Sequence, residues 1–216
     1  HHTAAAAELV QELGAVDGVP KDITTRAVAM LVTASERALE SGSLRMAVRH
    51  ASRALDLAGD EHATSQQVAR LRLVRATAYT EQRNYSGATA DIDALQATAV
   101  QLRDPILEAQ AYRLRGALSQ VAGRIDDARR ELGLAVDLLR NSDRTDLLAQ
   151  ALRVRGFIEM FGGSLIDAEW FFGEADGMYR SLGDERGMAY IEQHRAWIAF
   201  LSGNLAAART QLNDAA

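Results

Sequence analysis

Histidine supplies the most reactive side chains of this sequence, because the chain contains no cysteine. His50, His62 and His194 lie at spacings that match neither a shared metal site nor a Ser-His-Asp triad. We interpret them as isolated surface or packing residues. The sequence therefore predicts no catalytic residue, no metal site and no cofactor, and we expect a protein that is not an enzyme.

Paired acids offer a second source of chemistry. Asp126-Asp127 and Asp184-Glu185 stand where helices are expected to begin, and acids there stabilise the helix dipole. Glu36 and Glu40 lie one helical turn apart and could hold a cation, although a solvated pair is the favoured interpretation. The glycines follow no predicted strand and form no GxGxxG or Walker pattern, which excludes a phosphate-binding loop.

Arginine recurs at Arg75, Arg115, Arg155 and Arg195, each 40 residues after the last. One interpretation is a basic strip that binds an acidic partner. The other is structural: the aliphatic stems pack between helices while the guanidinium groups pair with acids of neighbouring helices. We favour the structural interpretation, because strict recurrence is typical of an element of a repeat.

Small residues recur with nearly the same period, and this pattern predicts the elements that position the side chains above. Alanines occur at 47, 88, 128, 168 and 208, at spacings of 41, 40, 40 and 40 residues. A fixed period of this size indicates a stacked array of helix pairs joined by glycine turns, because one pair cannot cover its own apolar face. The repeating sets are Ser35, Gly42, Ala47, Ala51 and Ala54; Ala76, Arg83, Ala88, Ile92 and Leu95; Gly116, Gly123, Ala128, Leu132 and Ala135; Gly156, Gly163, Ala168, Phe172 and Ala175; and Ala196, Gly203, Ala208, Leu212 and Ala215.

The periodic pattern divides the chain into a leading segment and five repeats. Residues 1–20 hold His1 and His2, which are typical of a tag remnant, then a short helix and a linker. The repeats are expected at about 21–60, 61–103, 104–142, 143–183 and 184–216, with the last one truncated. The expected helices cover 3–14, 22–41, 44–59, 65–82, 86–102, 105–122, 125–140, 144–162, 165–182, 185–202 and 205–216.

Composition restricts the function further. The net charge of −5 argues against a nucleic-acid-binding domain. Without cysteine there is no disulfide, and no signal peptide or membrane-spanning run is visible, so we expect a cytoplasmic protein. Lys21 is the only lysine beside many arginines, a bias typical of a GC-rich bacterial genome.

The repeat resembles the tetratricopeptide repeat, whose motif contains W-x2-L-G-x2-Y and A-x3-F. Gly116, Ala128 and Leu132 match in the third copy, and Gly156, Ala168 and Phe172 match in the fourth. The period is longer than is usual for that family, the closing proline is absent, and arginine replaces the motif leucine. The resemblance implies an all-α fold, a right-handed superhelical solenoid of antiparallel helix pairs. Long-repeat variants of this kind look like the sensor arms of bacterial transcription activators and pheromone-responsive regulators.

The resemblance also implies a concave groove lined by the first helix of each pair, with apolar and aromatic residues gathered toward the C-terminal end. Such a patch is typical of a binding surface, although it could equally pack on a following helix or a missing sixth repeat. The expected groove residues are Arg113, Gln120, Gln150, Arg153, Phe157, Met160, Phe161, Tyr190, Gln193, Trp197 and Phe200.

These features together predict a non-enzymatic scaffold that binds a peptide or a partner helix, as the interaction arm of a larger regulatory protein. Two other functions stay open: a sensor of a small ligand or signalling peptide, and a self-association module that forms a homodimer through the C-terminal repeat. No nucleic-acid or membrane partner is expected.

Overall fold

The structure is a computed structural model, and it describes residues 2–14, 17–59 and 62–214. Parts of several predictions lie outside the described residues: His1 of the tag remnant, Ala15 and Val16 of the linker, Asp60 and Glu61 at the joint after the first repeat, and Ala215 and Ala216 of the fifth repeat.

Eleven α-helices and no strand occur in the described part of the chain, which confirms the all-α prediction. Each expected helix is present, with ends within a few residues of the predicted ones. The helices are α1 (His2–Leu13), α2 (Ile23–Glu40), α3 (Leu44–Ala58), α4 (Ser65–Glu81), α5 (Tyr85–Leu102), α6 (Pro105–Val121), α7 (Ile125–Arg140), α8 (Thr145–Gly162), α9 (Leu165–Leu182), α10 (Glu185–Leu201) and α11 (Leu205–Asp214).

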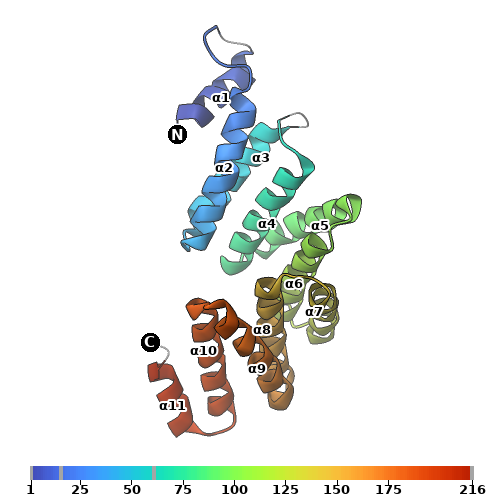
Figure 1. Ribbon diagram of the computed structural model, residues 1–216, viewed down its shortest axis with the longest axis vertical. Helices are drawn as coiled ribbons and strands as arrows, with labels where there is room; N and C mark the ends of the chain where they lie inside the picture. The colour runs from blue at the N-terminus through green and yellow to red at the C-terminus, as the bar shows by residue number, and fades with distance from the viewer. Residues whose placement is uncertain (1, 15–16, 60–61, 215–216) are drawn as a thin grey trace. The chain divides into compact units, whose positions relative to one another are not determined.

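Two compact units divide the chain, with the division between Asp104 and Pro105. The sequence predicted one uninterrupted array and gave no sign of this division. The first unit holds α1 and the pairs α2/α3 and α4/α5 (Figure 1). Helix α1 packs on α2 and α3 through the buried Ala4 and Ala7, so the leading helix shares the core of the first repeats.

The second unit holds the pairs α6/α7, α8/α9 and α10/α11 (Figure 1). Helix α8 contacts both α6 and α10, so the first helices of the three pairs are neighbours. The core of this unit contains Leu152, Phe172, Tyr179 and Ile191. These contacts place three first helices next to one another, and they carry all the expected groove residues.

The small residues of the repeat lie where helices meet most closely. Ala47, Ala88, Ala128 and Ala168 have no exposed surface. A methyl group added to Gly156 would lie 2.6 Å from the Phe172 ring, which is closer than carbon atoms can pack. Helices α8 and α9 therefore cross at a distance that only a glycine allows.

The turns between paired helices need a left-handed residue, and glycine supplies it at most of them. Gly163, between α8 and α9, has φ of 99°. Arg83 takes the equivalent place between α4 and α5, with φ of 61°. A side chain in this region is strained, so the second repeat carries a cost that the fourth avoids.

Candidate functional site

The recurring arginines bind polar groups of their own and of neighbouring helices. In the first unit, Arg75 of α4 donates two hydrogen bonds of 2.7 Å to Asp91 of α5 and one of 3.1 Å to Ser52 of α3. Asp91 is buried, and Arg75 is largely covered. The Asp91 carboxylate helps to raise the pKa of Arg75 through these hydrogen bonds, so both groups stay charged and connect three helices.

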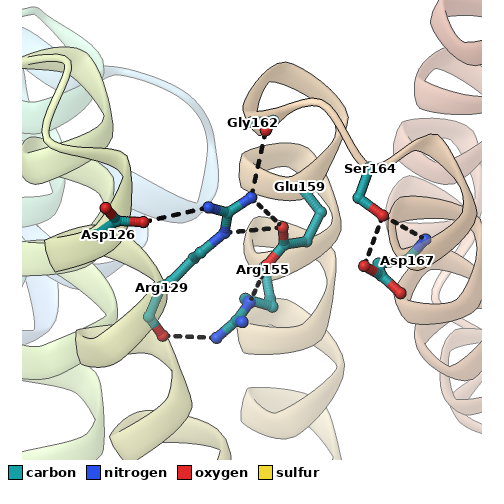
Figure 2. Close-up of polar contacts among 7 residues, drawn as sticks. All are labelled: Asp126, Arg129, Arg155, Glu159, Gly162, Ser164 and Asp167. Carbon is teal, nitrogen blue, oxygen red and sulfur yellow. Dashed lines mark hydrogen bonds and ion pairs between the residues drawn. The ribbon is translucent and has the colours of Figure 1, made fainter.

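Arg155 of α8 does the same in the second unit (Figure 2). Its Nε donates to Glu159 at 2.8 Å, and its Nη1 donates to the Arg129 carbonyl of α7 at 2.5 Å. Glu159 is buried and also accepts from Arg129, whose Nη2 reaches the Gly162 carbonyl at 3.3 Å. The guanidinium of Arg155 lies 5.3 Å from the centre of the Phe171 ring, a cation–π contact with α9.

Arg195 of α10 pairs with Asp176 at 2.9 Å and Glu169 at 3.0 Å, both on α9. These two partners come from the preceding pair, and Glu192 of α10 itself lies 3.4 Å from the Arg195 Nη1. The structural interpretation of the recurring arginines is confirmed for Arg75 and Arg195, whose guanidinium groups pair with acids of a neighbouring helix. It is confirmed in part for Arg155, because Glu159 lies on the same helix and the contact with α7 is a backbone carbonyl.

The expected groove residues of the second unit lie on α6, α8 and α10, and we call the exposed and half-buried members of this set the groove face. Phe161 is 50% exposed, Trp197 46% and Phe200 53%. Phe157 contacts Phe161 edge-on, with ring centres 4.9 Å apart, and Trp197 contacts Phe200 at 6.0 Å. The exposed rings of Phe161, Trp197 and Phe200 keep a large apolar area in water, which is typical of a docking surface.

The predicted patch is wrong for one residue. Met160 is only 3% exposed and belongs to the core of the second unit, so a partner has no access to it. Met160 turns inward because α8 is flanked by α6 and α10 and has fewer open positions than an end helix. Phe157 is half-buried, and its ring contacts Phe161 on α8 and His194 on α10.

The polar part of the groove face centres on Tyr190 of α10. The Arg153 guanidinium of α8 lies 4.7 Å from the centre of the Tyr190 ring, so two expected groove residues meet here. Arg186, one turn before Tyr190, lies 5.6 Å from the same ring centre and donates to the Tyr190 hydroxyl at 3.2 Å. The other expected polar residues of the groove face differ in exposure. Gln193 is exposed, whereas Arg113, Gln120 and Gln150 are half-buried.

His194 lies beneath the aromatic residues. It is buried, its Nδ1 contacts the Tyr190 carbonyl, and its ring centre is 5.3 Å from that of Phe157 and 5.0 Å from that of Phe172. Burial lowers the pKa of His194, and the charge of Arg153 lowers it further. A neutral ring whose Nδ1 proton goes to the carbonyl fits this setting, so His194 supports the groove face and is a packing residue.

Sequence reasoning missed Arg186 as a groove residue. The signal was its place four residues before Tyr190, since residues at this spacing share a face of a helix. It also missed an exposed apolar pair on α9, Ile166 and Trp170, which are 85% and 58% exposed. Their four-residue spacing carried the same signal.

Glu36, which the sequence offered as a cation ligand, is paired with an arginine. Glu36 accepts two hydrogen bonds from Arg70, at 2.7 and 2.8 Å, and Arg70 belongs to α4, the next first helix. Within the described ranges, no group of three or more histidine, aspartate or glutamate side chains could hold a metal ion. Among the helices of the described residues, none combines the length and apolar character needed to cross a bilayer.

Solved structures with the same arrangement of helices identify the fold. Apo RapI superposes with a TM-score of 0.70 at 13% identity, over 97% of this chain and 86% of that one. The Rap conjugation gene regulator of plasmid pLS20, in complex with the Phr* peptide, gives 0.72 at 14% identity, over 98% and 57%. A signal-transduction ATPase from Pyrococcus horikoshii with a tetratricopeptide repeat sensor gives 0.66 at 11%, over 99% and 33%.

This chain has the tetratricopeptide-repeat fold. The identities are too low to carry more than the fold, and no protein-family model or curated protein matches the sequence. The long-repeat resemblance drawn from the small-residue sets is thus confirmed at the level of architecture.

Proposed function

We propose that the chain is a non-enzymatic scaffold that binds a peptide or a partner helix on the groove face of α6, α8 and α10. The observation that carries this proposal is the exposure of Phe161, Trp197 and Phe200 beside the polar cluster of Arg153 and Tyr190. Large aromatic side chains next to arginine are the usual composition of binding hot spots.

The geometry favours an elongated ligand. Packed helices have axes about 8–10 Å apart, so three neighbouring first helices present a face about 20 Å wide. An extended segment of about six residues or a short helix matches this width. The likeness to a Rap regulator solved with the Phr* peptide supports an elongated ligand by analogy of fold.

The broader role that we propose is the sensor or interaction arm of a larger bacterial regulator in the cytoplasm, with transcription as the regulated process. The likeness to a signal-transduction ATPase with a tetratricopeptide repeat sensor supports this role, again by analogy of fold. Occupation of the groove face would be the signal that such an arm passes on.

Selection from a peptide library tests the proposal. Labelled wild-type chain is screened against a bead library of random decapeptides with acetylated and amidated ends. The control is the double variant Phe161→Ser, Trp197→Ser, which removes the exposed aromatic area and leaves the buried core intact. We expect the wild type to select aromatic peptides and the variant to select none. Equal selection by both proteins would contradict the proposal.

Self-association is a second candidate, favoured by the exposed apolar residues of the last pair. Trp197, Phe200 and Leu201 on α10 and Leu205 on α11 are all exposed. Light scattering across a concentration series decides between the two candidates. A dimer that Trp197→Ser converts to a monomer would assign this surface to a second copy of the chain.

A further inference from the structure

The charge of Arg153 has no acidic partner among the described residues. Its Nε is buried and makes no hydrogen bond, and within the described part of the chain Arg153 forms no ion pair. Arg129, Arg155 and Arg195 in the same unit each have a carboxylate. Buried donors are nearly always satisfied in folded proteins, so an unsatisfied one calls for an explanation.

The surroundings of Arg153 hold its guanidinium in place without neutralising it. Tyr190 supplies a ring face, and Arg186 brings a second positive charge to the same ring. Tyr179 is buried, which raises its pKa, while the charge of Arg153 and a hydrogen bond with Arg153 act in the opposite direction. The acid Asp184 also acts on Tyr179, but its carboxylate is engaged as the N-cap of α10, where it accepts from the Gly187 amide at 2.8 Å.

The groove positions of the second unit contain no acidic residue. The equivalent positions of α2 and α4 carry Glu36, Glu40 and Glu81, and Glu36 neutralises Arg70. The guanidinium of Arg70 is therefore neutralised by a groove-position acid of its own unit, whereas no groove position of the second unit supplies an acid to Arg153.

We infer that the groove face binds an acidic side chain of its ligand at Arg153, with Arg186 assisting, and an aromatic or aliphatic side chain at Phe161. This inference rests on the proposed function and names the chemistry of its ligand. A planar guanidinium pairs strongly with a carboxylate, and the half-buried position of Arg153 limits competition from water. The net charge of −5 makes an acidic peptide side chain a better fit than the phosphates of a nucleic acid.

The spacing of the two contacts follows from α8. Arg153 and Phe157 are one turn apart and Phe161 is one turn further, so the polar and apolar contacts are separated by about 6–12 Å. An extended ligand covers this distance in about two to four residues, and a helical ligand in about four to eight. We expect selected peptides to carry Asp or Glu at one of these distances from an aromatic residue.

The test uses the capped decapeptide library, so that side chains are the only carboxylates. Wild type, Arg153→Gln and Arg153→Lys are screened in parallel, and Arg70→Gln is the matched control from the first unit. Selected peptides are then remade with each Glu replaced by Gln and each Asp by Asn, and affinities are measured at low and high salt. Thermal melting confirms that each variant is folded, and Arg153→Lys keeps the charge if the glutamine variant proves unstable.

The expected results separate the two proposals. Removal of the peptide carboxylate should weaken binding to the wild type and Arg70→Gln by about tenfold, and binding to Arg153→Gln hardly at all. The wild type and Arg153→Gln could instead bind aromatic peptides that lack an acid, with equal affinity. This result would overturn the inference and leave the scaffold function standing. If the wild type selects no peptide, both the scaffold function and the inference fail. If it binds single-stranded oligonucleotides through Arg153, the acidic-peptide inference is overturned in favour of nucleic acid.

Discussion

The first helices of the two units share one repeat and present different surfaces. Glu36 of α2 occupies the position that Phe157 holds in α8 and Trp197 in α10. In the first unit Glu36 pairs with Arg70, whereas in the second unit Arg153 lacks a carboxylate and lies against Tyr190. This difference indicates that the buried positions of the repeat determine the fold, whereas the exposed positions can vary and so determine which ligand binds.

The buried positions are alike in both units. Ala88 and Ala168 are fully buried, and Arg75 and Arg155 both connect their own pair with the preceding helix. Even here the partner differs, because the residue that follows each arginine by 16 positions is Asp91 in one unit and Phe171 in the other. An ion pair and a cation–π contact thus occupy the same place in the repeat.

The largest effect is expected from Arg75→Ala. It leaves the buried Asp91 without its partner, and an uncompensated buried charge costs about 3 kcal/mol of unfolding free energy. Arg70→Ala, which removes an exposed pair in the same unit, should cost less than about 1 kcal/mol. Urea unfolding of both variants measures the difference.

A loss of ligand binding by Arg75→Ala at full stability would reverse the structural interpretation of the recurring arginines. The same comparison with Arg155→Ala extends the test to the second unit, where Glu159 keeps Arg129 as a second partner. We therefore expect Arg155→Ala to cost less than Arg75→Ala.

Overpacking tests whether the core is equivalent in the two units. Ala88 and Ala168 have no exposed surface, so Ala88→Leu and Ala168→Leu each force a larger side chain between packed helices. Both should lose about 1–3 kcal/mol of unfolding free energy. Ala90→Leu, at an exposed position of α5, is the control and should change little. Unchanged stability of either core variant would contradict the alignment of the repeats.

A pH-dependent effect is expected from His194 in the second unit. Its pKa is lowered, first by burial, so the unfolded chain takes up a proton at a higher pH than the folded chain does. Its contribution to stability is complete above the ordinary value of 6.5 and falls as the pH drops below it. In thermal melts at a series of pH values, His194→Leu should reduce the fall of the melting temperature below pH 6.5. His50→Leu in the first unit should reduce it less, because His50 is only half-buried. Identical pH profiles for wild type and His194→Leu would show that the ring does not titrate there.

The smallest effect concerns the strained turn of the first unit. Arg83→Gly removes the backbone strain of a side chain in the left-handed region, so it should stabilise the protein by about 0.5–1 kcal/mol. Gly163→Ala, at the equivalent turn of the second unit, should destabilise it by about 1 kcal/mol. Melting temperatures that move together in the two variants would contradict the assignment of these turns.

The sequence predicted the helices and their pairing because one buried position recurs in every copy. The period alone located Ala128 and Ala168, and the glycines located the turns. Exposure was harder to predict. Met160 and Phe200 are equivalent in the repeat, yet one is buried and the other is open, since α8 has a first helix on each side. The missing partner of Arg153 was also hidden, because ion pairs between helices depend on rotamers that no spacing specifies.

The central claim is that ligand binds the groove face of the second unit, and the two tryptophans test it directly. Trp197 lies on that face in α10, and Trp170 lies on α9, the second helix of the preceding pair. In nitrogen-15 NMR each indole N–H gives its own signal, which can be followed as a selected acidic peptide is added. We predict that the Trp197 signal shifts until the peptide saturates the protein while the Trp170 signal stays in place. A shift of Trp170 with Trp197 unmoved would contradict the account.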